Sequence, residues 1–345
     1  MLSTRLRDAS IATSLLCFLA VSCHNPATSV KSTAADTASI VNWTNPRKGR
    51  IWEKENVVHI PLSAYENHLL GKVKTVSYRD YELPYGTDSL KVLTDTGMNE
   101  YNTAGYLVHQ FECDAHNVPR LNCTYLYNAQ NKATEWRLDI PEDHVKATTV
   151  ISYDDKGKKI EEVTRDSVKE NSRRVIYKYD NDGNEIESDI YDLGLVLQHI
   201  VIYKYDKKGY QIGYGETGPT RKFEYKMFCE YDDKGNKTAG ADYRSDSETT
   251  TKWTQINDAH GRRIETDYFL ADGTVLEKRY IRYDAMGYPV EYTTRKPDGS
   301  INEEKSYAYV NEYDDHGNII RQKELRYQDG RKLAITLTEY FISYY

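Results

Sequence analysis

A turn motif recurs along the chain every 26 residues, and this repeat constrains the fold more than any other feature. Each copy reads Tyr-Asp-x-x-Gly or a close variant. The turn glycines are separated by 26 residues five times and then by 30, and they are Gly157, Gly183, Gly209, Gly235, Gly261, Gly287 and Gly317. Two earlier copies end at Gly105 and Asn131, so nine units cover roughly residues 95–330. A fixed period of this length indicates a repeat architecture in which each unit packs on its neighbours.

Two columns precede the turn glycine. Tyrosine stands four residues before it in eight of nine units, and Asp or Asn stands three residues before it in all nine. An Asp side chain accepts hydrogen bonds from nearby backbone amides in a turn, and Gly adopts a left-handed conformation without a Cβ clash. The residues assigned to structural turns are Asp154, Gly157, Asp180, Gly183, Asp206, Gly209, Asp232, Gly235, Asp284, Gly287, Asp314 and Gly317.

The segments beside the turns favour β-strands, as in residues 175–179 and 200–205. The later units also contain Asp-Gly at 272–273, 298–299 and 329–330, a pair that favours a two-residue primed turn. We therefore predict an all-β fold: a long, curled antiparallel β-meander of about nine 26-residue β-hairpin repeats, or about 18 strands. A sheet this wide is expected to curl, since twisted open sheets rarely exceed about ten strands.

The loop length decides which residues share a face. Three residues after the turn glycine lies a mostly apolar column that includes Ile160 and Ile186. A four-residue loop places this column on the face of the tyrosines, whereas a three-residue loop with a bulge places it opposite. We favour the four-residue loop because it gathers the apolar side chains. The next column, with Glu161 and Glu187, is expected on a solvated face, paired with Lys and Arg.

The N-terminus has the pattern of a secretory signal. Arg5 and Arg7 precede an apolar run over residues 9–21, which is short for a membrane span. The small residues before Cys23 resemble a bacterial lipobox, which implies cleavage before Cys23 and acylation of its thiol. An ordinary signal peptide cut nearby and an uncleaved anchor are the alternatives.

Four segments follow from these patterns. Residues 1–22 form the signal peptide, and residues 23–50, rich in Ala, Ser, Thr and Asn, form a flexible tether. Residues 51–94 are expected to be an N-terminal cap with a short helix over 64–70 and the first strands, shielding the sheet edge. Residues 95–345 form the repeat domain, with a last strand near 333–345.

Composition excludes several classes of function. The net charge of −7 disfavours nucleic-acid binding, which requires a basic excess. Nine His lack metal-ligand spacing, and no catalytic nucleophile, phosphate loop or dinucleotide motif is present, so we predict no metal, cofactor or catalytic residue. Cys113 and Cys123 flank a turn, and a disulfide between them remains possible in an oxidising compartment, although a two-residue turn would separate their faces.

The Tyr-Asp-x-x-Gly units resemble YD repeats, the units of RHS and wall-associated repeat proteins. Together with the lipobox and the start Leu70-Gly71-Lys72-Val73, they make the chain similar to small YD-repeat lipoproteins of Gram-negative bacteria. The resemblance implies curled β-sheets and a lipoprotein of the outer membrane that faces the periplasm. No segment resembles the cleavage-associated core motif or the C-terminal toxin of large RHS proteins.

The tyrosines carry the one functional option in the repeat. The chain has 31 Tyr and only 6 Phe, and rows of phenol rings could stack on sugars or on a partner peptide. The alternative is that the rings form the core of a thin sheet. The candidate binding surface comprises Tyr153, Tyr177, Tyr179, Tyr203, Tyr205, Tyr231 and Tyr283.

We expect a membrane-anchored, non-enzymatic repeat scaffold that binds a protein or glycan partner at the cell envelope. One alternative is an envelope hydrolase with its site in an irregular stretch, residues 213–225 or 130–145. The other is an immunity or inhibitor lipoprotein that masks a toxin.

Overall fold

Almost all of the described chain lies in β-strands and tight turns. The computed structural model describes residues 69–84, 86–167, 172–245 and 249–345. The strands are β1 (Val73–Glu82), β2 (Val92–Tyr101), β3 (Leu107–Asp114), β4 (Pro119–Tyr127), β5 (Ala133–Ile140), β6 (Val145–Tyr153), β7 (Lys159–Asp166), β8 (Arg173–Tyr179), β9 (Glu185–Asp192), β10 (Leu197–Tyr205), β11 (Gln211–Thr217), β12 (Phe223–Tyr231), β13 (Lys237–Arg244), β14 (Thr249–Asn257), β15 (Arg263–Leu270), β16 (Val275–Tyr283), β17 (Pro289–Arg295), β18 (Tyr307–Tyr313), β19 (Ile319–Gln328) and β20 (Arg331–Tyr344). Two short 3₁₀ turns, η1 (Asp88–Leu90) and η3 (Glu303–Lys305), complete the described elements, and none of these is a helix that could cross a membrane.

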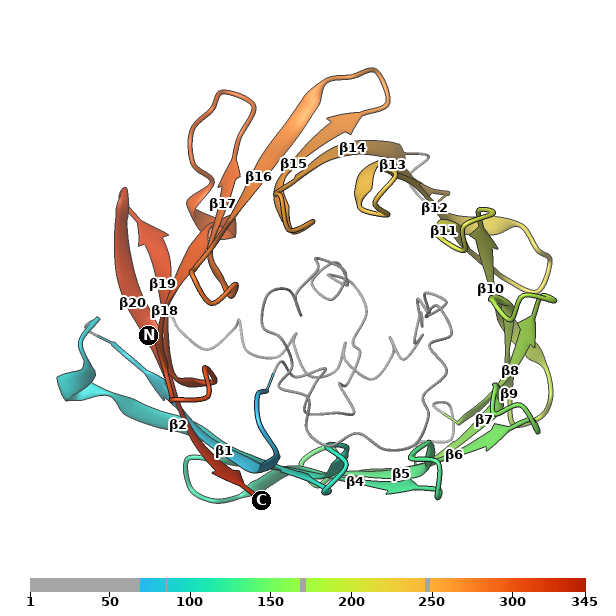
Figure 1. The fold of residues 1–345 in the computed structure, drawn as a ribbon, viewed down its shortest axis with the longest axis horizontal. Helices are drawn as coiled ribbons and strands as arrows, with labels where there is room; N and C mark the ends of the chain where they lie inside the picture. The colour runs from blue at the N-terminus through green and yellow to red at the C-terminus, as the bar shows by residue number, and fades with distance from the viewer. Residues whose placement is uncertain (1–68, 85, 168–171, 246–248) are drawn as a thin grey trace.

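The twenty strands form a closed antiparallel barrel (Figure 1). Each strand pairs with the next, and β1 also pairs with β20 from Val73–Tyr344 to Glu82–Thr336. The predicted open, curled meander of about 18 strands is therefore wrong. The physical reason is that β1 and β20, which lie outside the repeats, pair with each other and remove both free edges of the sheet.

The predicted N-terminal cap has a different form. Most of the expected helix over 64–70 lies outside the described residues, and the described Leu69 and Leu70 are not helical. The strand that follows, β1, does not cover an edge; it is hydrogen-bonded to β2 on one side and β20 on the other.

The Tyr-Asp turn encloses three residues, so the predicted four-residue loop is wrong. Asp154 N donates to Lys158 O at 2.8 Å, and Gly157 N donates to Asp154 O at 2.8 Å, with Gly157 at φ 76°. The Oδ1 atom of Asp154 accepts from Lys156 N at 3.0 Å and Lys158 N at 2.7 Å, which holds this tighter loop. Tyr153 pairs with Lys159 and Ser152 with Glu161, so Ile160 is the extra residue of a bulge, 39% exposed and off the tyrosine face.

Only one of the three Asp-Gly pairs forms the predicted two-residue turn. Asp329 and Gly330 both have positive φ, at 49° and 72°, between the paired Gln328 and Arg331. The other two pairs sit in three-residue loops, closed by Leu270 N to Thr274 O and by Lys296 N to Ser300 O. A single left-handed glycine and a bulge satisfy the hydrogen bonds there.

The column tyrosines connect neighbouring hairpins. Tyr179 Oη donates to Lys159 O at 2.6 Å, and Tyr153 Oη donates to Ala133 O at 2.7 Å, each twenty residues upstream. Equivalent bonds run from Tyr127 to Leu107 O, from Tyr231 to Gln211 O and from Tyr283 to Arg263 O. Each ring also packs on the residue after the preceding turn glycine, as Lys158 Nζ does 5.0 Å from the Tyr179 ring. The tyrosine column is therefore a contact between repeats.

The two faces of the sheet differ in chemistry. The face that carries the column tyrosines, here called the tyrosine face, also holds core residues such as Tyr125, Leu138 and Ala147. On the opposite face Glu161 pairs with Arg174, and Glu187 pairs with Lys178 at 2.6 Å. These ion pairs confirm the predicted role of the glutamate column. Hydrogen bonds from Arg221 and Lys178 lower the pKa of Glu187 to about 2.

All the Tyr-Asp turns lie at one end of the barrel, which we call the YD end, because consecutive antiparallel strands alternate in direction. The described chain enters at this end, where the side chain of the fully buried Asn318 holds Leu70. Asn318 Oδ1 accepts from Leu70 N at 2.6 Å, and its Nδ2 donates to Leu70 O at 2.9 Å and Tyr344 Oη at 2.7 Å. The seam between β1 and β20 is thus fixed by a turn residue of the last repeat.

Candidate functional site

The repeat is interrupted once, where the glycine spacing grows from 26 to 30 residues between Gly287 and Gly317. The extra residues lie between β17 and β18 and contain η3. Pairing of these strands falls to two residue pairs, Glu291–Ala308 and Tyr292–Tyr307, whereas β18 and β19 share seven. The interruption therefore weakens the sheet locally.

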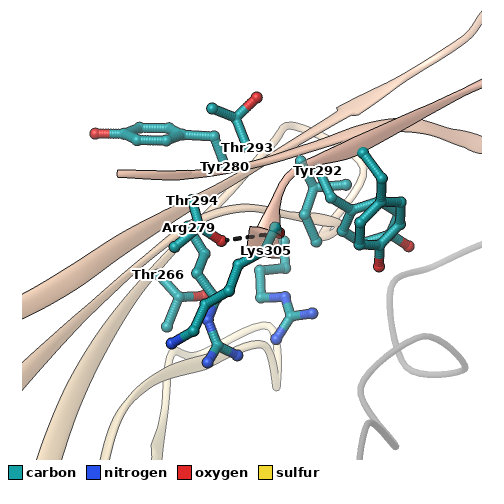
Figure 2. A pocket seen from close by; sticks show the side chains of 10 residues that line it. Thr266, Arg279, Tyr280, Tyr292, Thr293, Thr294 and Lys305 are labelled. Atoms are coloured by element: carbon teal, nitrogen blue, oxygen red, sulfur yellow. Dashed lines mark hydrogen bonds between the residues drawn. The ribbon is translucent and has the colours of Figure 1, made fainter. Parts of the chain in front are cut away.

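A hollow of about 340 Å³ lies beside this interruption (Figure 2). Two cross-strand rows build it: Thr266, Arg279 and Thr294 are in register, as are Ile281, Tyr292 and Tyr307. We call this hollow the insertion pocket and define it by the residues Arg263, Thr266, Arg279, Tyr292, Lys305 and Tyr307. Its volume lies at the small end of the range of about 300–1,000 Å³ for small-molecule sites.

The insertion pocket is cationic. Arg263, Arg279 and Lys305 line it, and Glu277 beside it binds two of them, Arg279 Nη2 and Lys305 Nζ, each at 2.6 Å. Burial acts to raise the pKa of Glu277, but hydrogen bonds from Lys305 and Arg279 outweigh it and lower the pKa overall. Three cations against one carboxylate leave an excess of two positive charges in this set.

One buried hydroxyl of the insertion pocket has no partner. Thr266 is 3% exposed, and its Oγ1 makes no hydrogen bond among the described residues. By contrast, Thr294 Oγ1 in the same row donates to Lys305 O at 3.3 Å. Because buried polar groups are almost always hydrogen-bonded, the Thr266 hydroxyl is a feature that a bound polar group would satisfy.

Two aromatic rings form one wall of the insertion pocket. Tyr292 and Tyr307 stack with their ring centroids 4.6 Å apart at 25°. The Arg326 guanidinium lies 4.9 Å from the Tyr307 ring and supports it. The pocket thus combines a flat aromatic wall with cations and a hydroxyl.

The seven tyrosines proposed from sequence lie elsewhere, in the sheet. Tyr177 and Tyr203 are buried, at 8% and 5% exposure, and the other five are half-buried. Burial raises the pKa of Tyr177 well above its usual range. The hydroxyls of Tyr153, Tyr179, Tyr231 and Tyr283 bond backbone carbonyls of the preceding hairpin. Their use as a binding surface remains a prediction, and these contacts favour a structural role.

Sequence reasoning missed Tyr292 and Tyr307 because neither stands in the repeated column. The signal that could have found them is the change in spacing from 26 to 30 residues, which marks the only altered interval after Gly157. An insertion of this kind maps to an irregular loop, and in repeat proteins such loops often carry binding residues.

The cysteines are separate from the insertion pocket. Cys113 and Cys123 are both buried free thiols. Cys123 is paired with Gln110, three residues from Cys113 along β3, so the two thiols lie on opposite faces of the sheet. Cys23, the proposed lipidation site, lies outside the described residues. Within the described ranges, no three His, Cys, Asp or Glu side chains gather to hold a metal ion.

The two stretches proposed for a hydrolase site form ordinary hairpins. Residues 130–145 contain β5, and residues 213–225 contain parts of β11 and β12. Gly215 is required in the second stretch because a Cβ there would lie 2.5 Å from the Phe223 ring. The irregular composition therefore reflects packing of one large ring.

A second hollow, of about 310 Å³, lies where the tyrosine column is broken by Asn257. Asn257 Nδ2 donates to Lys237 O at 2.7 Å, the bond that a tyrosine hydroxyl makes in other units, but it supplies no ring. We expect Asn257→Tyr to fill the hollow and to stabilise the barrel by about 1–2 kcal/mol. Thermal unfolding followed by circular dichroism measures this.

The matched variant for this test is Asn257→Ala, which removes the hydrogen bond to Lys237 O without adding a ring, and it should lower the melting temperature. A lower melting temperature for Asn257→Tyr than for the unchanged chain would show that the hollow does not accept a ring.

No family model and no curated protein matches the sequence. Among solved structures, the chain is similar to a porin-like protein from Bacteroides uniformis, with 11% identity, a TM-score of 0.36, and coverage of 82% of this chain and 98% of that one. A porin-like protein from Bacteroides vulgatus matches with 12% identity, a TM-score of 0.28, and coverage of 77% and 97%. A TcdB2-TccC3-Cdc42 structure matches with 11% identity and a TM-score of 0.25 over 72% of this chain, which spans 15% of that chain. No function transfers at these levels of similarity.

Proposed function

We propose that this chain is a non-enzymatic binding protein of the cell envelope that captures a glycan or protein partner in the insertion pocket. The observation that carries the proposal is a coincidence of three features at one place. The repeat gains four residues, strand pairing falls to two residue pairs, and a lined hollow lies beside them. Elsewhere the column tyrosines and turn aspartates are engaged in holding the barrel together.

The chemistry of the insertion pocket supports binding over catalysis. A general base works best with a pKa near the operating pH. The carboxylate beside the pocket, Glu277, is paired with Arg279 and Lys305, and its pKa is lowered. It is therefore a weak proton acceptor near neutral pH, whereas cations and stacked rings are suited to holding a ligand.

The proposed location rests on the N-terminal sequence. The charged start, the apolar run and the small residues before Cys23 support export and attachment through a lipid on that cysteine. The composition of residues 24–50 supports a solvated tether between the lipid and the barrel. We propose attachment to the outer membrane with the barrel in the periplasm.

The test is a binding screen of the full chain in detergent against glycans, peptidoglycan fragments and envelope proteins. Fluorescence reports the soluble ligands, and affinity capture reports the proteins. We expect saturable binding that is lost in the double variant Tyr292→Ala, Tyr307→Ala, since both rings line the insertion pocket. Truncating a buried aromatic anchor typically costs about 2 kcal/mol or more of binding energy, roughly 30-fold in affinity.

The control is Tyr191→Ala, a half-buried tyrosine on β9 that does not line the insertion pocket. It should bind as the unchanged chain does, and circular dichroism verifies that both variants fold. If the partner binds the double variant as tightly as the control, the site lies elsewhere on the molecule.

A further inference from the structure

We infer that the ligand of the insertion pocket is an acidic sugar, a hexuronic acid unit of a glycan. Its carboxylate would lie against the pocket cations, its ring against Tyr292 and Tyr307, and one of its hydroxyls at Thr266. This inference rests on the proposed function and names the chemical class that the same site takes.

Charge supplies the first step. Lys305 uses one of its three N–H donors on Glu277, and its side chain is 53% exposed, so it has donors left for a second acid. Arg263 and Arg279 add positive charge around the same hollow. A ligand with one carboxylate would offset half of the excess of two positive charges, whereas a neutral sugar would offset none.

The geometry of the donors favours a carboxylate over a phosphate. Arginine recognises phosphate best through its two-pronged fork, which makes two parallel hydrogen bonds. On Arg279 this fork already engages Glu277 through Nε at 2.7 Å and Nη2 at 2.6 Å. The remaining donors around Lys305 act as a point charge, which suits a monoanion with neighbouring hydroxyls.

The hydroxyl and the rings supply the sugar character. Thr266 Oγ1 is buried and unpartnered, and a hydroxyl group can both donate to it and accept from it. The stacked pair Tyr292 and Tyr307 gives a flat apolar wall with polar rims, which matches the faces of a pyranose ring. A volume of about 340 Å³ limits the enclosed part of the ligand to one or two sugar units.

The experiment is isothermal titration calorimetry of the full chain in detergent with digalacturonic acid, its neutral counterpart galactobiose, inorganic phosphate and acetate. We expect digalacturonic acid to bind at least about tenfold more tightly than galactobiose, because a hydrogen bond to a charged group contributes roughly 1.5–3 kcal/mol. Lys305→Met should lower its affinity by about tenfold and abolish the preference over galactobiose.

Two further variants separate the contributions. Thr266→Val keeps the shape of the side chain and removes the hydroxyl, so it should weaken both sugars equally. Lys252→Met removes a cation that donates to Ala271 O away from the insertion pocket, and it should change nothing. Fold is verified for each variant by thermal unfolding.

Each other outcome overturns the inference in its own way. Equal affinity for digalacturonic acid and galactobiose would leave the glycan function standing and refute the acidic class. Phosphate or acetate binding as tightly as digalacturonic acid, with no effect of Tyr292→Ala, would indicate a simple anion site. If no sugar binds but a protein partner is captured through Tyr292 and Tyr307, the sugar class fails while the binding function stands. If no partner depends on the insertion pocket, both fail.

Discussion

Deleting β20, residues 331–345, is expected to abolish the cooperative fold. This strand pairs with β19 on one side and with β1 on the other, so its loss opens the barrel and exposes two sheet edges. It also removes Leu337, which is fully buried against Tyr81 and Leu83. Typical domains are stable by only about 5–15 kcal/mol, and the loss of two strand interfaces is expected to exceed that margin. Far-UV circular dichroism during thermal unfolding measures the effect.

The control for the deletion keeps the strand and changes one exposed side chain. Phe341, paired with Ser77 across the seam, is 50% exposed, and Phe341→Thr should unfold within a few degrees of the unchanged chain. A truncated chain that still melts cooperatively at the original temperature would show that the ring does not depend on its last strand.

Asn318→Ala is expected to destabilise the barrel by about 3–5 kcal/mol. Asn318 is fully buried, and its side chain bonds Leu70 N at 2.6 Å, Leu70 O at 2.9 Å and Tyr344 Oη at 2.7 Å. Alanine leaves these groups unpaired inside the protein, and each buried unpaired group costs about 1–3 kcal/mol. Denaturant unfolding, with the free energy extrapolated to zero denaturant, measures the loss.

Asn184 provides a matched control, since it occupies the same position after a turn glycine in another repeat. Its Nδ2 bonds only the adjacent Asp180, at 2.9 Å, and it is half-buried. Asn184→Ala should therefore cost about 1 kcal/mol or less. Equal losses for Asn184→Ala and Asn318→Ala would mean that the seam is not the site of the effect.

Local features of the fold could be read from the sequence because they repeat. The positions of the turns, the strands beside them and the glutamate ion pairs follow from columns that recur every 26 residues. The loop register could not be read so, because it depends on Asp154 Oδ1 reaching the amides of Lys156 and Lys158. Apolar clustering alone favoured the wrong register.

Closure and the insertion pocket could not be predicted for a related reason. Closure depends on a pairing between β1 and β20, which share no repeat motif and lie at opposite ends of the sequence. The insertion pocket depends on cross-strand neighbours such as Thr266 and Arg279, whose proximity follows only from the register. The tyrosines attracted attention as a surface, yet their hydroxyls bond the preceding hairpin.

Closure of the barrel between β1 and β20 is the central structural claim, because it fixes the register around the ring. A disulfide engineered across the seam tests it most directly. Ser77 and Phe341 are directly paired in the antiparallel register, where Cβ atoms lie close enough for a disulfide. In the double variant Ser77→Cys, Phe341→Cys, mild oxidation should give an intramolecular disulfide in nearly every molecule, seen by non-reducing electrophoresis and peptide mass mapping. Thiols that stay reduced, or that join only separate molecules, would contradict a closed barrel.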